Sequence, residues 1–503
     1  MKTKKSPGGA PAPSIEERRR EVKEACAQIV ELVDQGEPRA LAEVEEQVWT
    51  QVLAVGRAAM ALFLARQAAR PRPTSYEQAG VEHLVVQETT TSEIGTRFGK
   101  VPFARPVGRH ADGSRGPRDL PVDRDLGLVS GFSLGSVLAM TRLCAQMAFA
   151  SARATFASFC EWTPSQRTVL RMVDTVGAEA RGFLEQAAPP PDDGDILVIQ
   201  VDGRGAPMID ATEKARRCQP RRPGQEGTAR HRRRRRRRDR VRPRRRKGDK
   251  SKNAKVAFVA VIYTLQSTDQ GCEGPLGKRL VATFDSHEAL FAWLLPEAKK
   301  RGYGSKHTLF IADGSEHIWR LQKQYLPDAE PCLDWYHVVE KLWEVGRCIH
   351  PEGSAELTAW IAARTRELRG RSGACRVFDA LSTAYQSIAK TGPGTKTKRD
   401  KILQVHQHLA EHQHRLRYHD LRRRDLDIGS GAVEGAVRNL VGMRLDGPGM
   451  RWSRDRAERI LHLRCIHLNG QWDDFAAYLA RRRLQLAAVP VPTRTHDAKR
   501  QAA

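Results

Sequence analysis

Three acidic residues far apart in the chain are candidates for a shared metal site. Asp202 and Asp313 each follow an apolar, β-branched run and precede a glycine, in "ILVIQVDG" and "KHTLFIADG". Such runs predict buried strands, and a carboxylate at the end of a buried strand lies at the sheet rim, where α/β folds bind their ligands. Glu434 is the one acid in "IGSGAVEGAVRNLVGM" and follows a Gly-Ser-Gly turn that allows a helix to begin near Ala432.

Carboxylates that lie close together repel each other unless a cation is placed between them. Mg²⁺ and Mn²⁺ accept hard oxygen ligands, and two such ions can support phosphodiester cleavage. We therefore predict a site for two Mg²⁺ or Mn²⁺ ions, with Asp202, Asp313 and Glu434 as ligands and catalytic residues. Each acid alone also has a structural interpretation, since "DG" is a common turn and a glutamate in the first turn of a helix stabilises the helix dipole.

The elements around these acids predict a mixed α and α/β fold. Three strands (196–203, 255–265 and 278–285) come before the first helix of this region, and further strands at 306–314 and "AEPCLDW" alternate with helices. Three strands without intervening helices favour an antiparallel meander at one edge of an α/β sheet. That order is typical of the RNase H-like fold, so we expect an RNase H-like catalytic core.

The core is predicted to be one part of a chain with several regions. A Pro-rich linker, "QAAPPPDDGD", separates it from what precedes. The expected regions are an N-terminal helical region (1–75), a small β-containing segment (76–130), a helical region (131–186), the core (195–350 and 425–453) with a basic insertion (204–254) and a helical insertion (351–424), and a C-terminal helical region and tail (454–503).

The helical region at 131–186 is compatible with a helix-turn-helix. Thr163 is the expected N-cap of its second helix, with Pro164 at the first helical position. That helix would carry Gln166, Arg167 and Arg171 to DNA. An ordinary helical hairpin fits the same pattern.

The positive charge of the chain is concentrated in the basic insertion. The whole chain carries +26, and residues 214–255 hold 22 Lys or Arg against 3 Asp or Glu, a local net charge of +19. Such a block indicates a polyphosphate partner, since each neutralised phosphate releases counterions; a solvated loop is the alternative. The expected nucleic-acid-binding residues there are Arg232, Arg233, Arg234, Arg235, Arg236, Arg237, Arg238, Arg244, Arg245 and Arg246.

The cellular location is predicted from the absence of membrane-spanning and signal-peptide patterns. It has no run of 18 apolar residues and no signal-peptide pattern at its start, and its nine cysteines are scattered. We expect a cytoplasmic, nucleoid-associated protein with no membrane partner.

Four motifs resemble those of bacterial insertion-sequence DDE transposases of the ISKra type. They are "VDGRGAPM", "ADGSEHIW", "CLDWYHVVEKLWEVG" and "GSGAVEGAVRNLVGMRLDGPGMRWS", and the resemblance covers about residues 80–480. It implies a DDE triad of Asp202, Asp313 and Glu434, which cleaves phosphodiester bonds and transfers strands. It also implies binding to terminal inverted repeats and target DNA, by a homodimer or a larger synaptic assembly.

The resemblance also indicates supporting residues. "DWYH" is similar to a signature that gives Asp334 and His337 such a role, with Asp334 a rival for the second acid and His337 open to a purely local role in its helix. Arg438, one turn after Glu434, would pair with that acid or with a phosphate. Trp452 would stack on an unpaired base or serve as a buried anchor.

The sequence departs from the family pattern in two places. The Cys-pair segment that relatives often carry is missing from "FARPVGRHADGSRGPRD", and the arginine run is not a family feature.

Two other functions stay open. An RNase H-like nuclease acting on RNA or a hybrid would fit the arginine-rich segment. A catalytically silent nucleic-acid-binding regulator is the other alternative.

Overall fold

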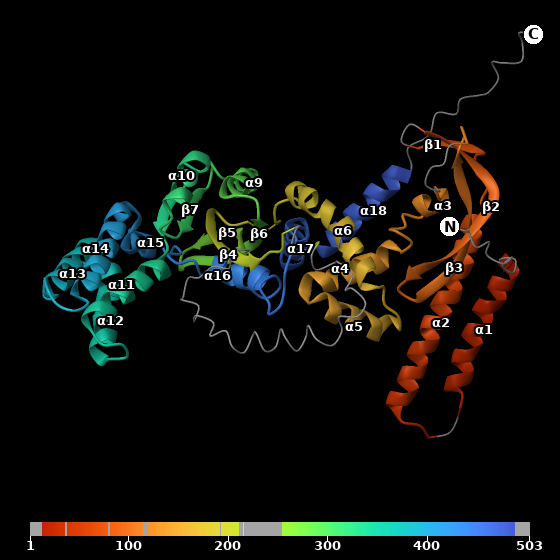
Figure 1. The fold of residues 1–503 in the computed structure, drawn as a ribbon, viewed down its shortest axis with the longest axis horizontal. Helices are drawn as coiled ribbons and strands as arrows, with labels where there is room; N and C mark the ends of the chain where they lie inside the picture. The colour runs from red at the N-terminus through yellow and green to blue at the C-terminus, as the bar shows by residue number, and fades with distance from the viewer. Residues whose placement is uncertain are drawn as a thin grey trace, which may run out of the picture. The chain divides into compact units, whose positions relative to one another are not determined.

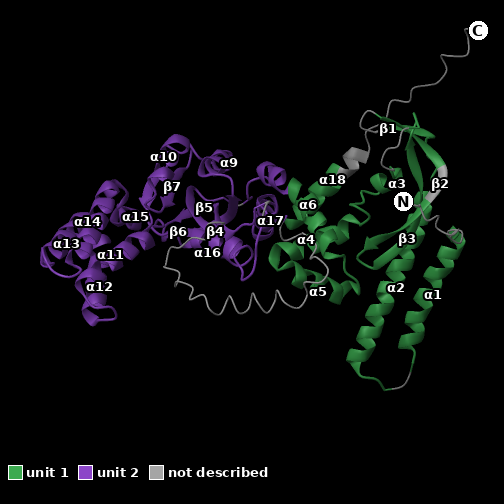
Figure 2. Ribbon diagram, viewed as in Figure 1, with its two compact units in different colours: residues 1–179, 471–503 green, residues 180–470 purple. Residues whose placement is uncertain are grey.

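A computed structural model of the chain describes residues 13–35, 38–78, 81–113, 119–191, 193–210, 215 and 254–487. The described residues form a mixture of helices and sheets, as expected (Figure 1). They divide into two units, residues 1–179 with 471–503 and residues 180–470 (Figure 2). The predicted DNA-binding arginines from Arg232 to Arg246 lie outside the described residues.

The first unit begins with a helical hairpin. Helix α1 (Ile15–Val33) starts at a capping box in which the side chains of Ser14 and Glu17 each accept a hydrogen bond from the other residue's backbone N–H. Helix α2 (Leu41–Ala68) packs against α1. Among the described helices, α2 is the one that is long and apolar enough to cross a membrane, and 17% of its most apolar window is buried.

A three-stranded antiparallel sheet follows, formed by β1 (Ser75–Gln78), β2 (Val81–Thr96) and β3 (Gly99–His110). The sequence predicted a small β-containing segment here, and within it β2 and β3 are long and pair along most of their lengths. The start of β3 has the alternation typical of a strand with one buried face, since every second residue there is buried. Ile94, Val101 and Phe103 pack there against α2.

Five helices complete the first unit: α3 (Pro121–Asp125), α4 (Leu134–Gln146), α5 (Phe149–Cys160), most of α6 (Gln166–Gln186) and α18 (Trp472–Ala487). Helices α4 and α5 are separate because Met147 leaves the helical conformation. The predicted cap of α6, Thr163, was wrong. Ser165 takes that place, because its Oγ accepts the N–H of Thr168 at 3.2 Å.

The second unit is built on a five-stranded mixed sheet in the order β6-β5-β4-β7-β8. Its strands are β4 (Ile196–Pro207), β5 (Ala254–Thr268), β6 (Gly271–Thr283), β7 (His307–Ala312) and β8 (Glu330–Leu333). Strands β6, β5 and β4 pair antiparallel with one another, whereas β7 is parallel to both of its neighbours, β4 and β8. Helices α9 (His287–Lys300), α10 (Glu316–Tyr325) and α11 (Trp335–Ile349) lie between or after the later strands, as the sequence predicted.

Residues after α11 form the predicted helical segment to one side of this sheet (Figure 1). It contains α12 (Ala355–Leu368), α13 (Gly373–Ser387), α14 (Thr395–Glu411) and α15 (Tyr418–Arg423), and α12, α13 and α14 all contact α11. The hydroxyl of the fully buried Tyr418 donates a hydrogen bond to the Leu333 carbonyl at 2.8 Å, which ties α15 back to β8.

The chain then returns to the sheet as α16 (Gly431–Val437), which packs on β4 and β5. It continues as a π-helical turn (Arg438–Gly442), a form that is frequent at functional sites. Helix α17 (Arg454–Leu468) then packs against β6.

Candidate active site

The strand register places three aspartates side by side. Val201 of β4 pairs with Ala312 of β7, and Ala312 pairs with Leu333 of β8. The next residue after each partner is an aspartate: Asp202, Asp313 and Asp334. Because all three strands run parallel, these carboxylates lie at one level across the sheet.

Asp202 differs from its predicted position in one respect. It lies inside β4 and not at the end of the strand, since β4 continues to Pro207. The extra residues remain strand because they pair with β5, for example Gly203 with Phe258. The basic insertion between the two strands is therefore shorter than the predicted 204–254.

Glu434 joins the aspartates from α16. It lies in the first turn of that helix, as predicted, and its Oε1 accepts a hydrogen bond from Ser430 Oγ at 2.9 Å. A cavity of about 210 Å³ brings these side chains together. It is lined by Val201, Asp202, Asp313, Asp334, Tyr336, His337, Glu340, Ser430 and Glu434.

Burial and like charges make the cavity unfavourable for negative charge. The pKa of Asp202 is raised to about 6, first by burial and to a smaller extent by the charges of Asp313, Glu434 and Asp334. The backbone N–H of Gly203 opposes this shift by donating to Asp202 Oδ1 at 2.6 Å. A cation would remove the penalty by neutralising the cluster.

The donor set fits a hard divalent cation. Carboxylate oxygens from two adjacent strands and one helix are the ligands that Mg²⁺ and Mn²⁺ prefer. As the side chains lie, no three His, Cys, Asp or Glu residues in the described part of the chain converge as a ready-made metal site. Asp202, Asp313 and Glu434 would therefore hold ions only after moving closer together, and Glu434 is an exposed side chain with room to move.

Asp334 is placed to position the site. It is 5% exposed, and both of its oxygens accept backbone N–H groups, from Ser430 at 2.7 Å and from His337 at 2.9 Å. These bonds tie the start of α11 to the residue that precedes α16. Asp313 is adjacent to Asp202 in the register, whereas Asp334 is one strand farther away. The geometry thus favours Asp313 over Asp334 as the second ligand.

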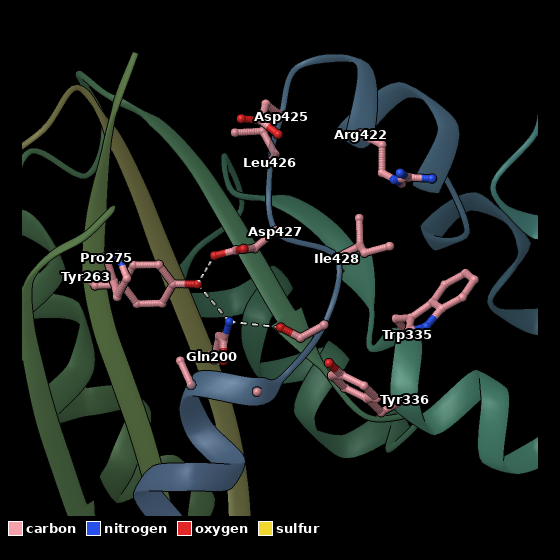
Figure 3. A pocket seen from close by; sticks show the side chains of 13 residues that line it. Gln200, Tyr263, Pro275, Trp335, Tyr336, Arg422, Asp425, Leu426, Asp427 and Ile428 are labelled. Carbon is pink, nitrogen blue, oxygen red and sulfur yellow. Dashed lines mark hydrogen bonds between the residues drawn. The ribbon is translucent and has the colours of Figure 1, made fainter. Parts of the chain in front are cut away.

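Gln200 is a site residue that the sequence analysis missed. Its side chain is 1% exposed, and its Oε1 accepts the Val433 N–H at 3.0 Å. Its Nε2 donates to the Gly429 carbonyl at 3.1 Å and to the Tyr263 hydroxyl at 2.9 Å (Figure 3). The available signal was a single amide in an otherwise apolar strand, since a buried polar group needs partners.

The helical segment also contributes to the surroundings of the site. His337 Nε2 lies 3.3 Å from His408 Nε2 on α14, and the His408 ring contacts the ring of His412. His412 Nε2 lies 3.2 Å from the Gly314 carbonyl, next to Asp313. Burial lowers the pKa of all three histidines, that of His412 to about 4. His337 is therefore held by a distant helix as well as by its own.

Arg438 and Trp452 differ in how they fit their predicted roles. Arg438 is exposed, and within the described part of the chain it forms no ion pair with Glu434, which leaves the phosphate role as the prediction. Trp452 is 4% exposed, its Nε1 donates to the Leu445 carbonyl at 2.9 Å, and the Arg444 guanidinium covers its ring at 4.8 Å. The burial of this ring favours the anchor role over base stacking for Trp452.

The predicted DNA-reading residues of the first unit are accessible. Gln166, Arg167 and Arg171 are all exposed at the start of α6. Whether α5 and α6 read DNA or form an ordinary hairpin stays a prediction. The chain as a whole matches no protein-family model and no curated protein sequence.

Asp202→Asn should alter how stability depends on pH. The pKa of Asp202 is about 6 in the folded protein and near 4 in the unfolded chain. Its protonated carboxyl group therefore stabilises the fold below pH 4, and this stabilisation is lost as the pH rises through about 6. Relative to the variant, wild type in EDTA should lose about 2 to 3 kcal/mol of unfolding free energy between pH 4 and 7. Urea unfolding across this range measures the effect.

The control is Asp328→Asn, which neutralises an exposed acid of the same unit. It should track wild type at every pH. Mg²⁺ should stabilise wild type more at pH 7 than at pH 5, and should not stabilise Asp202→Asn in this way. Equal pH dependence of wild type and Asp202→Asn would contradict the proposed burial of charge.

Gln200→Leu should loosen α16. It leaves the Val433 N–H and the Gly429 carbonyl without their partner, at about 1 to 3 kcal/mol for each group that stays buried. Hydrogen exchange of residues 430–437 should become faster. Gln322→Leu is the matched control, since Gln322 is a buried glutamine bonded to the Leu326 and Ala329 carbonyls. Unchanged exchange at 430–437 in Gln200→Leu would rule out the positioning role.

Trp452→Ala should destabilise the protein by about 3 to 5 kcal/mol, because it removes a large buried side chain. At a temperature where the variant stays folded, its affinity for DNA should equal that of wild type. Urea unfolding and fluorescence anisotropy measure the two quantities. Normal stability with weakened DNA binding would instead support contact between Trp452 and a base.

Proposed function

We propose that this chain is a DNA transposase of the DDE type, which cleaves and joins DNA strands at terminal inverted repeats with the help of divalent cations. The observation that carries the proposal is the cavity in which Asp202, Asp313 and Glu434 meet. These residues are about 110 to 120 positions apart in sequence and occupy the places that the motifs of ISKra-type transposases would give to the triad.

The sheet supports an RNase H-like core for this unit. Strands β6, β5 and β4 form an antiparallel meander, and β7 and β8 extend it in parallel. The first acid lies on the central strand, the second follows its parallel neighbour, and the third comes from a helix packed on the same sheet. A helical segment separates the second acid from the third, as the resemblance implies.

In this proposal the chain orients the reacting groups. Divalent cations, when bound, supply stabilisation of charge at the scissile phosphate and activate the attacking oxygen. Asp202, Asp313 and Glu434 would hold these ions. Gln200 and Asp334 fix the backbone on which Glu434 is carried, so that its carboxylate has a limited range of positions.

Two successive displacements follow from the proposal. Water attacks the scissile phosphodiester and releases a 3′-hydroxyl at the end of the element. That hydroxyl then attacks a phosphodiester of target DNA, so that one P–O bond forms and another breaks. Bringing two DNA ends together requires a homodimer or a larger assembly.

DNA binding would come from two parts of the chain. The exposed Gln166, Arg167 and Arg171 of α6 are suited to contact a groove and its phosphates. The basic residues between β4 and β5 would hold flanking or target DNA without reading its sequence. We place this reaction in the cytoplasm, at the nucleoid.

Asp202→Asn and Glu434→Gln should each lower strand cleavage and joining by more than about 100-fold, because each removes a ligand from the cation site. DNA binding should remain at the wild-type level, and Asp328→Asn should remain active. The measurement uses labelled DNA carrying the sequences that flank the gene, with Mg²⁺ or Mn²⁺.

The products of wild type separate the candidate functions. Joined strands support a transposase. Cleavage of RNA or a hybrid without joining would favour a nuclease, and binding without chemistry would favour a silent regulator. Retained cleavage in Asp202→Asn would remove Asp202 from the site.

A further inference from the structure

A second cavity lies next to the acidic one. It has a volume of about 460 Å³, and its lining includes Trp335, Tyr336, Arg422, Asp425, Asp427 and Gly429 (Figure 3). Tyr336 lines both cavities. The backbone between them also alternates, since Gly429, Gly431 and Ala432 border the second cavity whereas Ser430 and Glu434 border the first. A polymer held at the acidic cavity can therefore extend into the second one.

Tyr336 presents an open aromatic ring at this junction. Tyr336 is 54% exposed. Its ring lies so close to Gly429 that a Cβ added to this glycine would lie 2.8 Å from the ring. The neighbouring Trp335 is not available in the same way. It is 7% exposed, with the Arg369 guanidinium over its ring at 4.7 Å and the Tyr418 ring at its edge. Tyr336 is thus the ring of this pair on which a planar ligand can stack.

The polar groups of the second cavity have both signs of charge. Arg422 is exposed, and its guanidinium pairs with no carboxylate in the described part of the chain. Asp425 accepts the Cys272 N–H at 2.9 Å, and Asp427 accepts the Tyr263 hydroxyl. A carboxylate has about four acceptor positions, so both acids can accept further hydrogen bonds.

These features together match a nucleotide. A base can stack on Tyr336, its amino or imino groups can donate to Asp425 or Asp427, and a phosphate can pair with Arg422. The volume lies within the range of about 300 to 1,000 Å³ that is usual for small-ligand sites. A paired base would be excluded, because its face is stacked and its edge is occupied.

We propose that the cavity between Tyr336 and residues 425–432 binds one unpaired nucleotide of the strand whose scissile phosphate lies at the acidic cavity. This inference rests on the proposed function, because it takes a polynucleotide as the substrate. It adds a requirement that the acids do not impose, namely that one base next to the cut is unstacked from its neighbours.

The test measures base stacking in the absence of chemistry. Single-stranded oligonucleotides carrying 2-aminopurine at successive positions are titrated with full-length protein in EDTA, at a salt concentration that weakens phosphate contacts. Wild type should quench the fluorescence of 2-aminopurine. Tyr336→Ala should weaken binding by about 5- to 150-fold and abolish the quenching, whereas Tyr336→Phe should retain both.

Phe159→Ala is the matched control. Phe159 is 61% exposed, belongs to the first unit and lines neither of the two cavities, so its loss should change neither affinity nor quenching. Equal binding and quenching by wild type and Tyr336→Ala would overturn the inference. Tyr336-dependent binding of free AMP without binding of the oligonucleotide would also overturn it, by assigning the cavity to a free nucleotide.

The fluorescence experiment on Tyr336 tests the nucleotide site separately from the strand-cleavage assay, which tests the proposed function. If strand cleavage is absent but the Tyr336-dependent quenching is present, the nucleotide site stands and the catalytic proposal fails. If cleavage occurs and Tyr336→Ala binds like wild type, the catalytic proposal stands and the nucleotide site fails.

Discussion

The candidate site depends on holding several carboxylates close together against their mutual repulsion. The strand register alone fixes Asp202, Asp313 and Asp334 at one level of the sheet, and backbone hydrogen bonds between strands supply the restraint. Burial adds to the repulsion, as the raised pKa of Asp202 shows. The carboxylates of such a site repel one another until a cation binds between them. This arrangement is common in metal-dependent chemistry.

The fourth carboxylate needs a different restraint, because Glu434 returns to the sheet only after the helical segment of residues 351–424. Two buried side chains provide it. Gln200 accepts from one backbone N–H of α16 and Asp334 accepts from the N–H of the residue that precedes that helix. Both bonds use amides at a helix N-terminus that have no partner within the helix. The same atoms therefore satisfy the start of α16 and position its acid.

The far end of this helical stretch is fixed by Trp452. Its backbone N–H donates to the Pro207 carbonyl at 3.1 Å, and its carbonyl accepts the Ile209 N–H at 2.8 Å. The chain that carries Glu434 is thus joined to β4 both before and after the glutamate. The backbone segments that carry Asp202 and Glu434 are consequently held by one continuous set of contacts around the central strand, whereas the exposed side chain of Glu434 has room to move toward a cation.

The sequence by itself determined the strands of the second unit, most of the helices and the three acids, because alternation, apolar runs and capping residues are local patterns. Tertiary structure decided what depends on distant partners. Gln200 and His408 became part of the site's surroundings only through residues about 70 to 230 positions away, and Trp452 became an anchor because Arg444 and Leu445 enclose it. A side chain's local sequence does not encode which remote group will meet it, since register and packing of the whole sheet set that.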